Sequence, residues 1–268
     1  MKHFRPRLSR RAFWVLCALL VCLRLALTGF QQAYIWVGGA PLDDELMFRA
    51  ANNISAGQWL GAYDYLTLSK AMFFPVWLAL LHALHLPYLV SGAALWCGAS
   101  LLTAFAFSPL WRKKEAGVGR VLTLALFAAL AFLPSSWAAY TLRVYRDNIF
   151  PALCLYFFAG MAGMALRAVL ETDKPLWPWL AAAGAGLACG YLDREDAGLF
   201  LLPFAAVATV IVAVVLAGMR RWKALAAQLI PYVMLGVGVL TFCTLNYTHY
   251  GVFALSDFSE GSFAAAMG

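Results

Sequence analysis

Charged residues are scarce in this sequence. Only 12% of its 268 residues are Asp, Glu, Lys or Arg, whereas 63% are hydrophobic and 15% are aromatic. A water-soluble fold needs far more charge to cover its surface, so a soluble globular protein is excluded. The apolar residues run on for about 20 positions without alternating, which argues against a transmembrane β-barrel. The sequence therefore predicts an all-α, polytopic transmembrane helix bundle.

Motifs of several enzyme classes are also missing. The sequence contains no Walker A, G-x-G-x-x-G, H-E-x-x-H or G-x-S-x-G motif, so nucleotide hydrolysis and the use of nucleotide sugars through a Rossmann domain are unsupported. The six cysteines lie in apolar runs without C-x-x-C spacing or histidine partners. We interpret them as small core residues and expect neither a disulfide framework nor a zinc site.

The net charge of +7 comes from basic residues clustered at the ends of apolar runs. This distribution is typical of membrane topology signals and headgroup contacts, so we expect a lipid bilayer as a partner and no nucleic acid. The first cluster, from Lys2 to Arg11, precedes an apolar run, 12–30, that is too long for the h-region of a signal peptide. We therefore expect a cytoplasmic N-terminus and a retained first span that runs outward.

Residues 72–86 decide the rest of the topology. This apolar run has only about 15 residues and contains Pro75, which is short for a span. If it does not cross the membrane, the three later basic clusters all become cytoplasmic, as the positive-inside rule requires. We therefore predict an interfacial or re-entrant helix within an outer loop, 31–87. This topology has seven spans, at 12–30, 88–110, 120–138, 149–167, 177–192, 198–218 and 225–247. The three basic clusters are 112–114, Arg167 with Lys174, and 220–223.

On this topology the acidic residues gather on the outer face. Carboxylates close to a bilayer are costly, so they call for an explanation. In the stretch Asp43-Asp44-Glu45, Asp43 is expected to be a helix N-cap, with the next two acids in the first turn. A carboxylate at this place is also suited to accept a proton from a hydroxyl group or amine.

Two further outer segments carry arginines beside acids, and an arginine fork is suited to bind phosphate. Each functional interpretation has a structural alternative. The acids at 43–45 are also explained by a helix start alone. Arg146 and Asp147 are also typical of an interfacial turn in which the two charges balance, and residues 193–196 are typical of a capping turn. Lys70 could equally be a lysine whose side chain extends to the lipid headgroups. The candidate substrate-binding residues are Lys70, Arg143, Arg146, Arg194 and Glu195.

Three features together resemble the GT-C superfamily of polytopic glycosyltransferases, which includes protein O-mannosyltransferases and lipid A aminoarabinose transferases. Asp44-Glu45 is similar to the acidic motif of that superfamily's first outer loop. Lys70 and Pro75 are similar to its Lys-Pro-Pro element, from which Ala71-Met72 departs. Asp147 is placed like the acid of its second outer loop. The resemblance covers roughly residues 1–250.

This resemblance implies an inverting transfer of a sugar from a polyprenyl-phosphate donor to an acceptor outside the cytoplasm. Asp44 would be the general base and Glu45 its support, with Asp147 as the further catalytic acid. Lys70, Arg143, Arg146 and Arg194 would offset charge on the departing lipid phosphate, and Glu195 and Asp196 would hold Arg194. Some relatives use a divalent cation, for which Asp43, Asp44 and Glu45 would supply the oxygen ligands.

Two other classes of function remain open. A membrane transporter or lipid flippase is the main alternative, although such proteins tend to carry charges at mid-membrane, whereas here the charges gather at one face. A non-catalytic scaffold is the second, but it has no need for acids and arginines on several outer loops. We expect residues 1–268 to form one domain in a bacterial-type inner membrane. Because the tail ends abruptly, we also expect a fragment or a short form of a longer protein.

Overall fold

The computed structural model describes residues 8–111, 115–171 and 174–257, and these residues form an all-α fold without β-strands. The predictions for Lys2, Arg5 and Arg7, for the cluster 112–114 and for the tail beyond 257 concern residues outside this range. The α-helices are α1 (Arg10–Gly29), α2 (Pro41–Ser55), α3 (Phe73–Ala83), α4 (Tyr88–Ala106), α5 (Ala116–Ala131), α6 (Phe150–Leu170), α7 (Trp177–Asp193), α8 (Ala197–Gly218), α9 (Trp222–Ala227) and α10 (Ile230–Tyr250).

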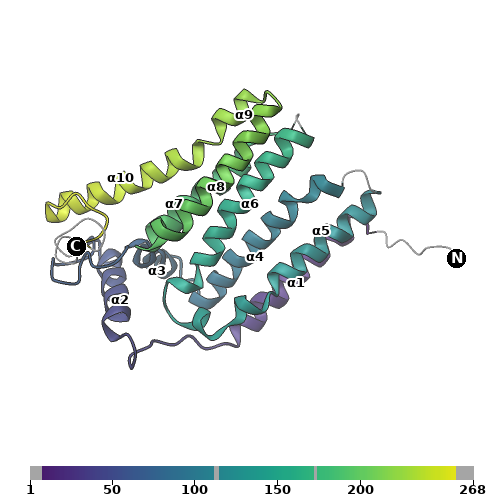
Figure 1. Ribbon diagram of the computed structural model, residues 1–268. Coiled ribbons are helices and arrows are strands. Elements are labelled where there is room, and N and C mark those ends of the chain that lie inside the picture. Colours follow the sequence, from purple (N-terminus) through teal and green to yellow (C-terminus); the bar gives the residue numbers. More distant parts are fainter. Residues whose placement is uncertain (1–7, 112–114, 172–173, 258–268) are drawn as a thin grey trace.

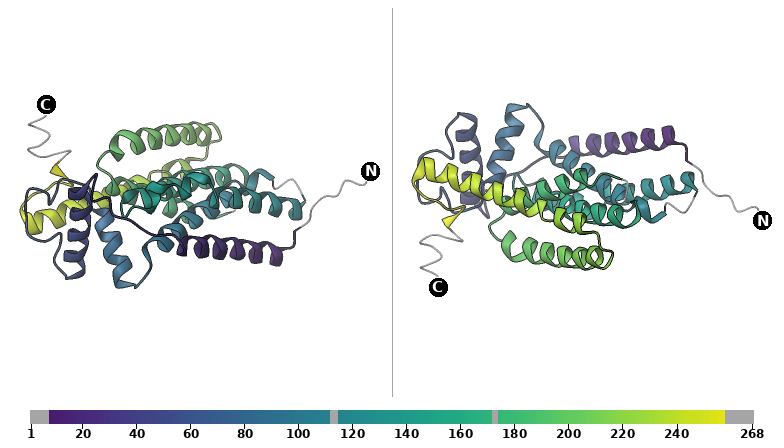
Figure 2. Two further views of the ribbon diagram at one scale, coloured as in Figure 1. Left: turned by 90° about the horizontal axis from the view of Figure 1, so that it is seen from below. Right: turned by 90° about the horizontal axis from the view of Figure 1, so that it is seen from above.

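The long helices lie side by side in one bundle, and the short helices α2 and α3 lie at one end of it (Figure 1). α6 occupies the centre, because it packs against α4, α7 and α8. α10 covers α7 on one side, while α1 and α5 cover α4 on the other. The two further views in Figure 2 show that α1 and α8 lie on opposite sides of the bundle.

Five stretches are long and apolar enough to cross a membrane, which identifies an integral membrane protein. They are α1, α4, α6, α8 and the segment Trp222–Tyr250, which spans α9 and α10. The expected count of seven also needs α5 and α7, which have 16 and 17 residues and run alongside the others. At 1.5 Å per residue such helices reach only about 25 Å, somewhat less than a typical hydrocarbon core.

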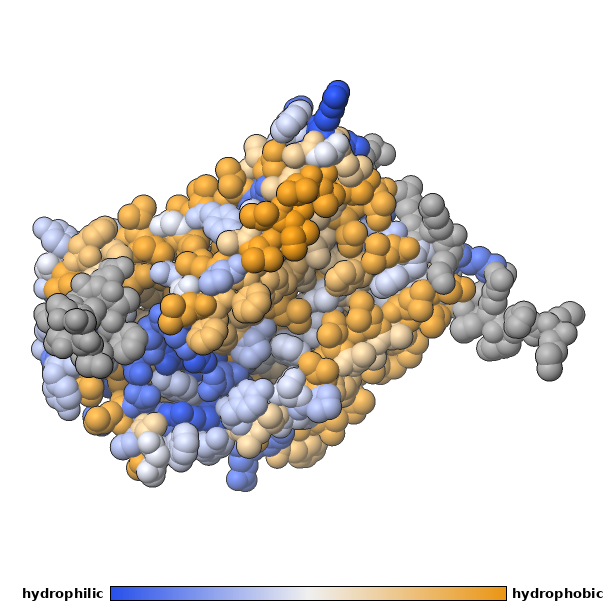
Figure 3. Space-filling model, viewed as in Figure 1, coloured by the Kyte–Doolittle hydropathy of each residue, from blue (hydrophilic) through white to orange (hydrophobic). Residues whose placement is uncertain are grey.

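The surface of the long helices is apolar where a soluble protein would be charged. On α8, Leu199, Phe204 and Val210 are 78%, 65% and 61% exposed. Figure 3 shows this apolar cover on the long helices, with hydrophilic residues gathered beside α2. Lipid chains are the solvent that such a surface requires, so the bundle faces a bilayer.

The first loop is more helical than expected, and its details correct two predictions. Pro41 takes the first position of α2 and Ala40 the N-cap position, so Asp43 lies inside the first turn and is not the cap. Proline suits that position because its φ is already helical. α3 is shorter than the predicted 72–86, since His85 adopts a left-handed φ of 53°. Its 11 residues are too few to span a bilayer.

The contact between α6 and α7 depends on glycine. A Cβ atom on Gly186 would lie 2.5 Å from the carbonyl oxygen of Leu153 and 2.5 Å from the amide nitrogen of Phe157. A Cβ atom on Gly160 would likewise meet the backbone of α7, 2.5 Å from the carbonyl oxygen of Trp179. Small residues thus let the two backbones approach closely, as is common between membrane helices.

We predict that Gly186→Ala lowers the free energy of unfolding by about 1–3 kcal/mol, because the backbone that the new methyl group meets has to move. Thermal unfolding in detergent measures the effect. Gly236→Ala in α10 is the matched control, since nothing lies within 4 Å of its Cβ position; helix propensity alone should leave that variant equal or slightly more stable. Equal stability of both variants would contradict the close approach.

Candidate functional site

Hydrogen bonds between segments that are distant in the sequence fix the backbone at the polar end of the bundle. The chain before α2 pairs with the chain before α6, as the Tyr34 amide donates to the Leu142 carbonyl at 3.1 Å and the Val144 amide to the Tyr34 carbonyl at 2.9 Å. Tyr88 at the start of α4 donates its hydroxyl proton toward the Arg143 carbonyl oxygen, at 2.9 Å. These bonds hold Arg143 and the residues after it over α2.

Asp44 is buried in an ion pair with Arg143. One carboxylate oxygen accepts from both Nε, at 3.0 Å, and Nη2 of the guanidinium. The other accepts from the backbone N–H of Trp36 at 2.6 Å. Since the side chain of Asp44 is only 1% exposed, its charge is compensated within the protein rather than by water.

A second set of ion pairs joins four elements of the fold. Glu195, in the turn between α7 and α8, accepts from both terminal nitrogens of Arg146. Lys70, just before α3, lies 3.4 Å from Glu195 and 3.8 Å from Asp43 on α2. Tyr145 closes the ring, because its hydroxyl accepts from Arg146 at 2.6 Å and donates to Asp43 at 3.3 Å.

Arg194 forms a third set of ion pairs. Its guanidinium binds Asp196 through Nε at 2.8 Å and Nη2 at 3.0 Å, and Asp147 through Nη1 at 3.0 Å. Next to it in the chain, Asp193 is fully buried, and both its carboxylate oxygens lack a hydrogen-bond partner within the described part of the chain. Arg146 donates to the backbone carbonyl of Asp193 at 3.3 Å.

These contacts define one ion-pair cluster, and it contains most of the residues that the sequence singled out. Glu45 is the exception, since it is exposed and has no ion pair among the described residues. Of the two acids predicted to hold Arg194, Asp196 binds it, whereas Glu195 binds Arg146 and Lys70. The cluster consists of Asp43, Asp44, Lys70, Arg143, Tyr145, Arg146, Asp147, Arg194, Glu195 and Asp196.

Sequence reasoning missed Tyr145 and Asp193. The centre of the Tyr145 ring is close to two guanidinium carbons, at 4.2 Å from that of Arg143 and 4.7 Å from that of Arg146. Its position between two arginines in the chain was an available signal, because aromatic faces attract guanidinium groups. Asp193 had no such signal, since nothing in its four-residue charged run distinguishes the fully buried acid from the partly buried ones.

The ion pairs also set the proton affinities at the site. Burial would raise the pKa of Glu195, but the hydrogen bond and the charge of Arg146 outweigh it and lower that pKa to about 2. Burial raises the pKa of the Tyr145 phenol to about 12, against the opposing charge of Arg146. Glu195 is therefore a permanent anion near neutral pH, and Tyr145 stays protonated and able to donate a hydrogen bond.

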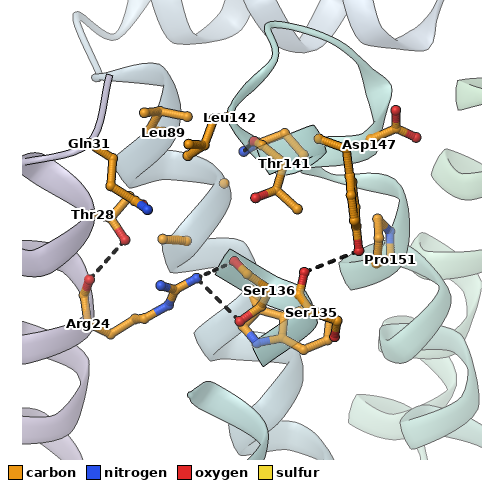
Figure 4. A pocket seen from close by; sticks show the side chains of 15 residues that line it. Arg24, Thr28, Gln31, Leu89, Ser135, Ser136, Thr141, Leu142, Asp147 and Pro151 are labelled. Carbon is orange, nitrogen blue, oxygen red and sulfur yellow. Dashed lines mark hydrogen bonds between the residues drawn. The ribbon is translucent and has the colours of Figure 1, made fainter. Parts of the chain in front are cut away.

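Two pockets flank the cluster. The first lies between α1, α4 and the segment before α6, and Asp147 is in its wall (Figure 4). The second is lined by Met72, Arg194, Glu195 and Phe242 among others. Within the described residues, no group of three or more His, Cys, Asp or Glu side chains is arranged to hold a metal ion. Asp43, Asp44 and Glu45 thus do not form a shared ligand set there.

Comparison with protein families, with characterised proteins and with solved structures gives no match for this chain.

We predict that Asp44→Asn lowers the free energy of unfolding by about 3 kcal/mol, because it leaves the Arg143 guanidinium without its buried counter-ion. Asp43→Asn is the matched control on the same turn of α2. Its carboxylate is 35% exposed and its ion pair with Lys70 is long, so stability should change by less than about 1 kcal/mol. Denaturation in detergent compares the two, and a larger loss for Asp43→Asn would contradict the ion-pair assignment.

We also predict an acid-dependent loss of stability that requires Glu195. Folding lowers its pKa from the ordinary 4.5 to about 2. The stabilisation, on the order of 3 kcal/mol, is therefore present above pH 4.5 and disappears as the pH falls toward 2. Unfolding of the wild type and of Glu195→Gln should differ at pH 6 and converge near pH 2. A constant difference between them over this range would refute the prediction, and Glu45→Gln serves as the exposed control.

Proposed function

We propose that this protein is an integral membrane glycosyltransferase that moves a sugar from a polyprenyl-phosphate donor to an acceptor outside the cytoplasm. One observation carries the proposal: four cationic side chains and their carboxylate partners meet at one end of an apolar helix bundle, beside two pockets. A lipid-linked phosphate is delivered at the membrane surface, and a site at the end of the spans meets it there. The resemblance to GT-C enzymes supports the same reaction.

The proposed topology has seven spans, α1, α4, α5, α6, α7, α8 and α10, and α3 as the interfacial helix. Its support is the arrangement of charges at the two ends of the bundle. Arg220, Arg221 and Lys223 lie beside α9, at the opposite end from α2 and the cluster (Figure 1). The positive-inside rule then places the α9 end and the N-terminus in the cytoplasm and the cluster on the outer face of a bacterial-type inner membrane.

Within the cluster, Lys70 and Arg194 are the cations best placed to bind the donor phosphate. Their side chains are 26% and 28% exposed, whereas those of Arg143 and Arg146 are only 10% and 4% exposed. Lys70 has no ion pair shorter than 3.4 Å among the described residues, so a phosphate oxygen can approach its ammonium group. Arg143 and Arg146 would then act as positioning residues that hold Asp44 and Glu195.

The proton acceptor in this proposal is Asp43. Asp44 was the expected base, but its oxygens already accept from Arg143 and from the Trp36 amide. Asp43 is more exposed. Its carboxylate oxygens lie 3.3 Å from the Tyr145 hydroxyl oxygen and 3.8 Å from the Lys70 ammonium nitrogen, so both contacts are long. Asp147 provides a second carboxylate, 32% exposed, with one oxygen bound to Arg194.

The transfer would proceed in one step with inversion. The acceptor hydroxyl oxygen attacks the anomeric carbon, its proton passes to the Asp43 carboxylate, and the bond from that carbon to the phosphate oxygen breaks. The lipid phosphate leaves with the electron pair of that bond. Lys70 and Arg194 offset its growing negative charge, which is typically a large part of the rate enhancement when the charges are fixed in advance.

We predict that Asp43→Asn reduces sugar transfer by about 100-fold or more, the usual contribution of a general base, while the protein stays folded. The assay uses proteoliposomes with a panel of labelled polyprenyl-phosphate sugars and follows release of the sugar to acceptors or to water. Glu45→Gln is the matched control, because Glu45 is exposed two positions away, and it should keep full activity.

Three outcomes would contradict the proposal in different ways. Full activity of Asp43→Asn would remove Asp43 as the base. No consumption of any donor by the wild type would remove the transferase. Movement of the intact labelled lipid between leaflets, without chemical change, would favour the flippase alternative instead.

A further inference from the structure

The pocket between α1 and α4 contains a charged group that the proposed reaction does not use. Arg24 lies on α1 and is 3% exposed. Its Nη2 donates to the Ser136 carbonyl oxygen at 2.7 Å, and its guanidinium carbon lies 3.4 Å from the ring centre of Trp137. Within the described structure, its Nε and Nη1 atoms have no hydrogen-bond partner. Figure 4 shows the side chain reaching from α1 toward Ser136 across the pocket floor.

A second group in the same wall also lacks a partner. Asn148 donates its amide N–H to the Thr141 carbonyl at 2.9 Å, but its side-chain oxygen is buried and accepts no hydrogen bond from any described residue. Thr28, Gln31 and Tyr140 add further polar groups to the lining, and Leu89 and Trp96 are among its apolar residues. The pocket thus combines two free cationic donors with one free neutral acceptor.

The depth of Arg24 in the membrane indicates the source of the ligand that would bind it. Arg24 precedes the end of α1 by five residues, which is about 8 Å along the helix axis and comparable to the thickness of one headgroup region. An unpaired charge at this depth is costly and requires a counter-ion. Each of the two free guanidinium nitrogens can donate to a phosphate oxygen, and the Asn148 oxygen can accept a hydrogen bond from a hydroxyl group.

We propose that this pocket binds the headgroup of an anionic phospholipid, with a phosphate oxyanion at Arg24 and a headgroup hydroxyl at Asn148. A lipid rather than a soluble anion is favoured, since Arg24 belongs to one candidate span and Leu89 and Trp96 to another. Asp147 lines the pocket and binds Arg194 of the ion-pair cluster, so the bound headgroup lies next to that cluster. This site does not require the transfer reaction and goes beyond it.

Thermal unfolding in nanodiscs tests the site. Phosphatidylglycerol carries both a phosphate diester and free hydroxyl groups, so adding it to phosphatidylcholine discs should raise the unfolding midpoint of the wild type by several degrees. Arg24→Met should lose this rise. In pure phosphatidylcholine the same variant should be as stable as the wild type or more stable, because it removes an unpaired buried charge.

Controls separate the source of the anion from general charge effects. Arg49→Gln removes a half-exposed arginine paired with Asp64 and should keep the full phosphatidylglycerol response. An equal rise with soluble glycerol phosphate would show a soluble ligand and overturn the lipid assignment. An unchanged response in Arg24→Met, or no response in the wild type, would overturn the site. If a variant that no longer responds to the lipid still transfers sugar, the proposed transferase activity stands and does not depend on the lipid site.

Discussion

The pairing of charges at the border of an apolar medium is the constraint on which the rest of this structure depends. The long helices supply almost no polar surface, and the acids and arginines of the ion-pair cluster meet at one end of the bundle. In a low dielectric a single unpaired charge costs far more than a paired one, and each partner therefore fixes the position of another. Asp44 holds Arg143, Glu195 holds Arg146, and Arg194 joins Asp147 to Asp196.

This pairing gives two neighbouring acids different roles. Consecutive residues of an α-helix point about 100° apart, so α2 directs Asp44 into the protein and leaves Asp43 partly exposed. The buried acid is committed to its guanidinium, and the exposed acid keeps oxygens that a substrate can reach. The same division separates the buried arginines, Arg143 and Arg146, which are paired with carboxylates, from Lys70. A frame of paired charges around a few accessible groups is what electrostatic preorganisation requires.

Two unpaired groups stand out against this frame. Arg24 keeps two free donors inside a candidate span, and Asp193 keeps a fully buried carboxylate without a hydrogen-bond partner among the described residues. Since the charges of the ion-pair cluster are paired with one another, these two groups outside it mark places where the protein alone does not complete its own electrostatics. Arg24 opens onto a pocket, and this combination connects the apolar bundle to a ligand that reaches it from the membrane.

The sequence by itself determined the class of the protein, because hydropathy and charge content depend on composition rather than on contacts. It also predicted which residues are functional candidates, since charges beside apolar runs are conspicuous, and it placed the helix boundaries of α4, α6 and α8 within a few residues. It could not assign partners, and the glycosyltransferase role stays a prediction. Only the tertiary structure decided that Arg146 pairs with Glu195, that Arg143 pairs with Asp44, and that Asp44 is enclosed while Asp43 is not. These outcomes depend on contacts between segments about 50 to 100 positions apart, and nothing local to any one segment encodes them.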